Sequence, residues 1–196
     1  MSPELEVIEG WVNHNAHVLD LGCGDGSLLR HLKSIKQATG YGLESGEDNI
    51  LKCIEAGVSV IEQDLNKGLK NFKEQSFDLV IMTQALQEIS SPHIMLAEML
   101  RIGKECIITF PNFGYWRNRS YLALRGRMPM SKTLPHAWYN TPNIHLCTFK
   151  DFEALCYRQH IKILDRTVVD LNYKNSWSMR IMPNLFGATA VYRVTK

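Results

Sequence analysis

Short apolar runs alternate with longer amphipathic stretches along this chain, and the alternation restricts its fold more than any other feature. Apolar runs typical of strands cover residues 17–21, 41–44, 58–63, 77–82 and 106–110. Stretches with apolar residues at helical spacing lie between them, at 27–38, 47–56 and 91–101. Strands joined by helices pair in parallel, because each helix must bury its apolar stripe on the sheet. The pattern predicts a doubly wound α/β fold.

The ends of the later helices carry specific signals. Ser91 and Pro92 supply a helix cap and a proline at the first helical position. Thr148 with Asp151 is a variant capping box that predicts a helix through Gln159. Strand-like runs follow at 161–169 and 188–194 with no helix required between them, so we expect the last two strands to pair antiparallel. The complete prediction is a mostly parallel seven-stranded sheet with an antiparallel C-terminal strand.

Length and composition exclude several classes of protein. The 196 residues fit one domain spanning 1–196, with an insert at about 111–147 after the fifth strand. The chain has 22 basic and 20 acidic residues, and because its net charge is so small we expect no nucleic-acid partner. No apolar run is long enough to span a membrane. The five cysteines form an odd count without a C-x-x-C pair, which favours a reducing compartment. We therefore expect a cytoplasmic protein.

The stretch VLDLGCGDG at residues 18–26 turns an expected strand into an expected helix through Gly22, Gly24 and Gly26. Glycines allow positive φ and a close ligand, and the helix start offers unpaired N–H groups. The spacing is shorter than the G-x-G-x-x-G of dinucleotide sites, and Asp20 would repel a pyrophosphate. The loop favours a nucleotide-like ligand with an ammonium group and no phosphate. A plain tight turn and an NAD site are the alternatives.

Further polar residues follow the neighbouring strands. Glu44 ends the second strand, Asp64 follows the third, and Thr83 and Gln84 follow the fourth. Ligands of open α/β sheets sit beyond the carboxyl ends of the strands, so we expect these side chains to converge with Asp20 on one crevice. Solvated caps at strand ends are the alternative explanation for the acids.

Together these motifs resemble the class I S-adenosylmethionine-dependent methyltransferases. The resemblance implies their Rossmann-like fold, with S-adenosylmethionine or S-adenosylhomocysteine as the cofactor. It implies that Asp20 and the glycine loop hold the methionine part, that Glu44 takes both ribose hydroxyls, and that Asp64 meets the adenine. The expected cofactor-binding set is Asp20, Gly22, Cys23, Gly24, Gly26, Glu44, Ser45, Asp64, Leu65, Thr83 and Gln84. The Asn/Asp-Pro-Pro-aromatic motif of amino-methylating nucleic-acid enzymes is absent after the fourth strand, which disfavours methylation of nucleobase amines.

No acidic residue lies between Glu105 and Asp151, and this stretch gathers cations among aromatic residues. The cations are Arg117, Arg119, Arg125, Arg127 and Lys132. Arginines beside aromatic side chains are typical of partner interfaces and anion pockets. We expect the four arginines to form a partner surface; a lid, or a solvated helix at 119–124, is the alternative.

Several other residues have a chemical and a structural interpretation. Cys23 is a candidate nucleophile near a helix start, although a small residue packed under the cofactor is favoured. Glu88 and His93 are a candidate acid and base, or parts of a solvated turn. His136, His145 and Cys147 lack paired ligand spacing, so we expect no metal site. Methyl transfer needs little beyond in-line positioning, so the sequence assigns no catalytic residue.

Five segments along the chain carry a second and more specific resemblance. They are VLDLGCGDG at 18–26, TQALQ at 83–87, FPNFGYW at 110–116, LRGRMP at 124–129 and WYNTPNIHLCT at 138–148. In these segments the sequence resembles the family of the methionine-biosynthesis protein MetW. The resemblance implies a cytosolic bacterial protein that supports homoserine O-acyltransferase in making the activated homoserine ester for methionine. An S-adenosylmethionine-dependent methyltransferase acting on a small molecule is the alternative function.

Overall fold

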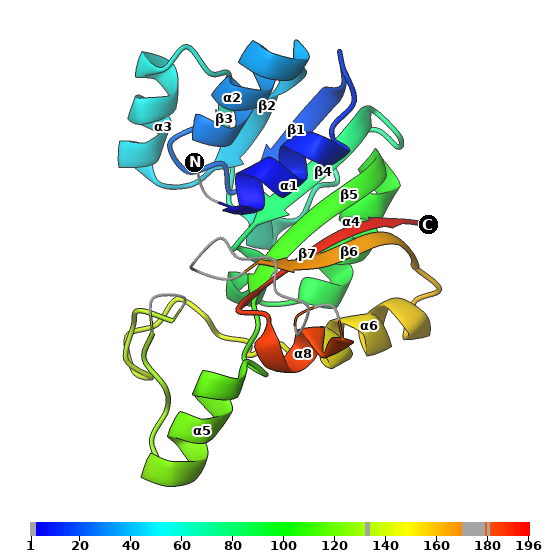
Figure 1. The fold of residues 1–196 in the computed structure, drawn as a ribbon. Coiled ribbons are helices and arrows are strands. Elements are labelled where there is room, and N and C mark those ends of the chain that lie inside the picture. Colours follow the sequence, from blue (N-terminus) through cyan, green and yellow to red (C-terminus); the bar gives the residue numbers. More distant parts are fainter. Residues whose placement is uncertain (1–2, 132–133, 170–178, 180) are drawn as a thin grey trace.

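The computed structural model describes residues 3–131, 134–169, 179 and 181–196, and within them seven strands form one sheet (Figure 1). The strands are β1 (His17–Leu21), β2 (Thr39–Glu44), β3 (Val60–Glu62), β4 (Phe77–Thr83), β5 (Gly103–Pro111), β6 (Lys162–Val169) and β7 (Thr189–Thr195). Their order is β3-β2-β1-β4-β5-β7-β6. The pairs from β3 to β5 are parallel, whereas β7 is antiparallel to both β5 and β6. The mostly parallel sheet with one antiparallel C-terminal strand is confirmed.

Helices cover both faces of the sheet (Figure 1). They are α1 (Pro3–Trp11), α2 (Ser27–Lys36), α3 (Glu47–Glu55), α4 (Pro92–Ile102), α5 (Trp116–Arg125), α6 (Phe149–Arg158) and α8 (Pro183–Phe186), with short 3₁₀ turns η1 (Leu65–Lys67) and η2 (Leu86–Glu88). On one face, α1 and α2 pack over Val18 of β1; on the other, α4 and α6 pack over Leu19. Adjacent strand residues thus enter different cores, as the two-residue period of a strand requires.

Helix α1 is an element that the sequence analysis did not predict. Its signal was present, because Leu5, Ile8 and Val12 recur at helical spacing and join the core under α1 and α2. Glu4 and Glu6 lie in its first turn, where negative charge complements the helix dipole. This helix adds a side chain to the site described below.

The predicted capping box of α6 is confirmed. Asp151 donates its backbone N–H to the Thr148 hydroxyl at 3.3 Å, and Thr148 returns its N–H to the Asp151 carboxylate at 3.1 Å. At α4, Pro92 is the first helical residue as expected, but the side chain of Ser91 makes no capping hydrogen bond. The predicted start of α4 is confirmed, whereas the predicted capping role of the Ser91 side chain is wrong.

The boundaries of three elements differ from those predicted from the sequence. Strand β5 begins at Gly103 instead of residue 106, because Gly103 to Glu105 still pair with β4. Helix α2 ends at Lys36 instead of residue 38, since Gln37 takes a left-handed conformation with φ of 53°. Strand β3 is limited to Val60–Glu62.

After Pro111 the chain turns out of the sheet and forms an arm that extends away from it, carrying α5 (Figure 1). The buried side chain of Asn112 holds the base of this arm. Its Nδ2 donates to the backbone oxygens of Asn184 at 3.1 Å and Gly187 at 2.8 Å, and its Oδ1 accepts from Gly114 N at 3.0 Å. The arm is thus fastened to the segment that leads into β7. Across the described residues, no helix has the length and apolar character needed to cross a membrane.

Candidate functional site

The glycine loop connects the end of β1 to the start of α2. Gly22, Gly24 and Gly26 have φ of 73°, 55° and 73°, a region that residues with a Cβ rarely adopt. Gly22 N donates back to Leu43 O of β2 at 2.8 Å, which keeps the loop beside the second strand. A Cβ on Gly24 would meet no atom within 4 Å, so this glycine serves backbone conformation and leaves open space above the loop.

Glu44, at the end of β2, holds the glycine loop through its carboxylate. Its Oε2 accepts the N–H of Gly24 at 2.8 Å, and its Oε1 accepts those of Ser45 and Gly46, each at 2.9 Å. A carboxylate has about four acceptor positions, so three backbone donors leave it little spare capacity. Sequence reasoning placed Glu44 at this crevice but gave no indication that it also fixes the loop.

Asp20 is the most unusual group of the site. Its side chain is 1% exposed, and no group among the described residues donates to its Oδ1. Burial, together with the nearby negative charge of Glu44, raises the pKa of Asp20 to about 7. A buried carboxylate without a partner is costly unless a cation or a donor reaches it. The position therefore suits a ligand that brings a positive charge.

Asp64 lies half-buried after β3 and begins η1. Its Oδ1 accepts the N–H of Asn66 at 2.9 Å, and Leu65 packs against the core under α4. Because β3 pairs in parallel with β2, Asp64 and Glu44 lie at the same edge of the sheet. Thr83 ends β4 at that edge as well, since Asp20 pairs in register with Ile81.

Gln84 contacts a residue that the sequence analysis did not place at the site. Its φ is 55°, and its Nε2 donates to Glu4 of α1 at 2.8 Å. The hydroxyl of Thr109 lies 3.4 Å from the same Glu4 carboxylate, at the end of β5. Burial raises the pKa of Glu4. Helix α1 therefore contributes an acid to the ends of β4 and β5, which only an N-terminal helix prediction could have suggested.

Cys23 packs beneath the glycine loop. Its Sγ lies 3.9 Å from that of Cys53, and a Cβ on Gly42 of β2 would come within 2.2 Å of it. Burial first, and then the charge of Asp20, raise the pKa of this thiol well above its usual range. A reactive cysteine needs a lowered pKa, so the burial of this thiol favours the packing role over the nucleophile interpretation.

The arm presents apolar and cationic side chains together. Leu124 is 85% exposed, and Trp138 and Tyr139 are each 75% exposed. The guanidinium of Arg117 lies over Trp116 and that of Arg125 over Tyr121, at 5.5 and 5.4 Å from the ring centroids. Arg127 is exposed, whereas Arg119 donates to the backbone of Gly114 at the arm's base. Lys132 lies outside the described residues.

The return segment of the arm comes back to the sheet. Ile144 and His145 both donate backbone N–H groups to Gln87 O of η2 at 3.0 Å. Glu88 lies close enough to Glu44 and His136 for their charges to act on it, with burial as the main reason that its pKa is raised. The insert thus combines an outer arm with a return segment that is hydrogen-bonded to η2.

The remaining candidates of the sequence analysis have structural roles. The His145 ring lies 3.4 Å from Ser90 O, and the Cys147 thiol donates to Thr148 O. Within the described residues no three His, Cys, Asp or Glu side chains are grouped so that they could hold a metal ion.

Comparisons with known proteins agree with this geometry. A family model described as "Methionine biosynthesis protein MetW" matches residues 2–194. The "Bifunctional methionine biosynthesis protein MetXA/MetW" of Rhodopirellula baltica is 34% identical over 183 residues, covering 89% of this chain. The chain spans only 29% of that relative's length.

More distant similarities are to methyltransferases. A ubiquinone biosynthesis O-methyltransferase of Hahella chejuensis is 26% identical over 80% of this chain and 73% of its own. The crystal structure of an S-adenosylmethionine-dependent methyltransferase from Mesorhizobium loti superposes with a TM-score of 0.71 at 15% identity, covering 100% of this chain and 98% of the other. At that identity the likeness establishes the fold and leaves the chemistry open.

Proposed function

The chain belongs to the MetW family of methionine biosynthesis proteins, and from that premise we propose that it binds S-adenosylmethionine and supports a homoserine O-acyltransferase. The observation that supports an acyltransferase partner is the name of the Rhodopirellula relative, which joins MetXA and MetW in one bifunctional chain. We take the MetXA half to be the acyltransferase. Linking two proteins raises their effective concentration, so the fusion supports a functional contact between the separate chains.

The residues of the crevice fit S-adenosylmethionine. The unpartnered carboxylate of Asp20 suits the ammonium of the methionine part, and the open glycine loop of Gly22, Cys23, Gly24 and Gly26 would hold the same part of the cofactor. Glu44 and Ser45 would meet the ribose, and Asp64 and Leu65 the adenine, with Thr83 and Gln84 at the end of β4. When bound, the cofactor would supply either an electrophilic methyl group or a signal of the pathway's end product.

Asp64→Ala is expected to weaken S-adenosylmethionine binding by about 1–3 kcal/mol, because the adenine would lose its hydrogen bond to this carboxylate. Isothermal titration calorimetry measures the change. The control is Asp25→Ala, which removes an exposed acid of the glycine loop. Unchanged affinity in Asp64→Ala would mean that the adenine lies elsewhere.

The arm is the proposed contact surface for the acyltransferase. Arg117, Arg125 and Arg127 carry its free positive charge, and Leu124, Trp138 and Tyr139 its exposed apolar area. Interface centres are enriched in such arginine and aromatic side chains. With all five cysteines free, we propose that this contact occurs in the reducing cytoplasm and that residues 1–196 act as one domain with the arm as an insert.

The test is the rate of the same organism's homoserine O-acyltransferase with this protein absent, present, and present with S-adenosylmethionine. We expect stimulation by the protein and a further change when the cofactor is added. An active acyltransferase with the same rate in all three conditions would refute the accessory role. Stimulation without any effect of the cofactor would refute only the proposal that the cofactor reports the pathway's end product.

A methyltransferase acting on a small molecule is the second candidate, and the similarity to the Hahella O-methyltransferase favours it. Glu88 of η2 and His93 of α4 are the acid and base proposed for proton transfer. Methyl transfer to a small acceptor in a screen with labelled cofactor would establish this alternative.

A further inference from the structure

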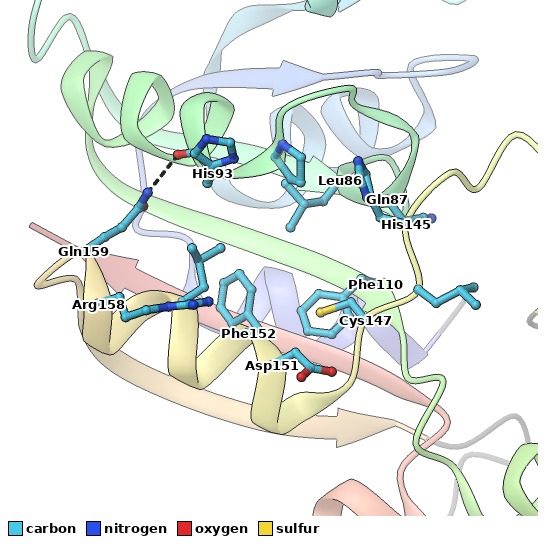
Figure 2. A pocket seen from close by; sticks show the side chains of 13 residues that line it. Leu86, Gln87, His93, Phe110, His145, Cys147, Asp151, Phe152, Arg158 and Gln159 are labelled. Carbon is cyan, nitrogen blue, oxygen red and sulfur yellow. Dashed lines mark hydrogen bonds between the residues drawn. The ribbon is translucent and has the colours of Figure 1, made fainter.

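A cavity of about 490 Å³ lies between α4 and α6, and the side chains that line it are drawn in Figure 2. Its inner wall is apolar: Leu86, Phe110 and Phe152 are buried, and Leu155 and Cys147 are partly buried beside them. None of the residues assigned to the cofactor lines it. Small-molecule pockets have volumes of about 300–1,000 Å³, so this one can accept the apolar body of a separate ligand.

One end of the cavity carries an unused positive charge. Arg158, in the last turn of α6, lines the cavity, and the described residues provide its guanidinium with no hydrogen bond or ion pair. Asp151 is the one acid among the described residues that line the cavity, and its carboxylate is engaged in the capping box with Thr148. The imidazole rings of His93 and His145 also line the cavity. The planar guanidinium of arginine binds carboxylates through two parallel hydrogen bonds.

The cavity also contains acceptors without donors. Gln87 is 6% exposed; its Nε2 donates to Gln84 O at 2.6 Å, but no described group donates to its Oε1. Gln159 is similar, since its Nε2 donates to His93 O at 3.3 Å and its Oε1 has no donor (Figure 2). Buried carbonyl groups without donors cost free energy. Because both oxygens are buried, the donor groups of a ligand would reach them once the glutamine side chains turn toward the cavity.

We propose that this cavity binds a small carboxylate with an apolar body. The carboxylate pairs with Arg158, and the body lies against Phe110 and Phe152. The bound acid is either a simple aliphatic acid or an apolar amino acid, whose ammonium would supply the donors that the two glutamines lack. This site is separate from the proposed cofactor crevice and does not depend on the proposed function.

Three probes of equal chain length distinguish these cases by calorimetry on the full chain: hexanoate, L-norleucine and the uncharged hexanamide. We expect hexanoate or norleucine to bind at least tenfold more tightly than hexanamide. Tighter binding of norleucine identifies an amino-acid site, and tighter binding of hexanoate a site for simple acids. Equal binding of hexanamide, or dissociation constants above about 10 mM for both acids, would overturn the proposal.

Arg158→Gln is expected to weaken the binding of whichever acid binds more tightly by at least tenfold. Its matched control is Lys150→Gln, which removes an exposed cation from the same helix away from the cavity. Because Arg158 is exposed, the substitution leaves the core intact. Leu155→Trp provides a second variant, since the larger ring would fill the cavity and reduce the binding of all probes. Undiminished binding in Arg158→Gln would overturn the assignment, while S-adenosylmethionine affinity in that variant tests the crevice separately.

Discussion

Asp20→Asn is expected to weaken S-adenosylmethionine binding by on the order of 100-fold at pH 8. The carboxylate is buried without a partner, and a bound ammonium would pair with it in a site closed to water. Loss of one partner of a buried charge pair typically costs about 2–5 kcal/mol. Asparagine keeps the size of the side chain, so the fold should survive. Titration calorimetry of both proteins at pH 8 gives the ratio, and an affinity within about threefold of the original would remove Asp20 from the site.

The same substitution should make the free protein more stable at high pH. Burial and the charge of Glu44 raise the pKa of Asp20 to about 7 in the folded chain, whereas the unfolded chain has the ordinary value near 4. The folded state therefore binds more protons between these values, and stability falls as the pH rises from about 4 to about 7. Three pKa units correspond to on the order of 4 kcal/mol.

Urea unfolding at pH 5, 6, 7 and 8 measures this effect. In Asp20→Asn, the free energy of unfolding should lack the part of its pH dependence that Asp20 causes. At pH 8 the variant should be more stable than the original protein. Glu4→Gln is the necessary control, because burial raises the pKa of Glu4 too and gives a slope of the same sign. If Asp20→Asn kept the full slope, the carboxylate would not be the group that titrates.

Replacing Arg117, Arg125 and Arg127 together with alanine is expected to weaken binding to the acyltransferase by on the order of 100-fold, with cofactor affinity unchanged. Arginines with aromatic neighbours are common among the residues that dominate interface energies. The stacked guanidinium groups are also held in place by Trp116 and Tyr121, so less side-chain entropy is lost on binding. Arg119 is omitted because it already bonds to Gly114 within the arm.

A pull-down titration with the acyltransferase, paired with calorimetry of the cofactor, measures both affinities. The matched control replaces Lys33, Lys70 and Lys73, three exposed lysines outside the arm, and removes the same net charge. Trp138→Ala tests the apolar part of the surface separately. If the arginine variant lost cofactor affinity and kept the partner, the segment would act as a lid of the crevice.

The sheet, and the position of three acids at one edge of it, could be predicted from sequence because both follow from local patterns. Apolar runs and glycine spacing fixed where β1 ends, and parallel pairing then required Asp20, Glu44 and Asp64 to meet at one edge. The hydrogen bonds from Gly24, Ser45 and Gly46 to Glu44 had no such signal. They depend on backbone directions in two loops that only the folded chain brings together.

The contribution of α1 could not be predicted for a related reason. The pairing of Glu4 with Gln84 joins residues 80 positions apart, and nothing in either segment marks the other as its partner. The cavity beside Arg158 is likewise assembled from η2, α4, β5, the return segment of the arm and α6. Contacts between distant segments depend on how the layers pack, which periodicity does not describe.

The position of β7 has a consequence for synthesis. This strand is the last described element in the chain, yet it lies inside the sheet, between β5 and β6. Until residues 189–195 have left the ribosome, β5 presents an unpaired edge and β6 has no neighbour to join. Exposed strand edges are templates for aggregation, and nascent domains are exposed to it during translation. The sheet therefore stays open between β5 and β6 until β7 has been made, and a chaperone that covers the edge of β5 would protect the chain until then.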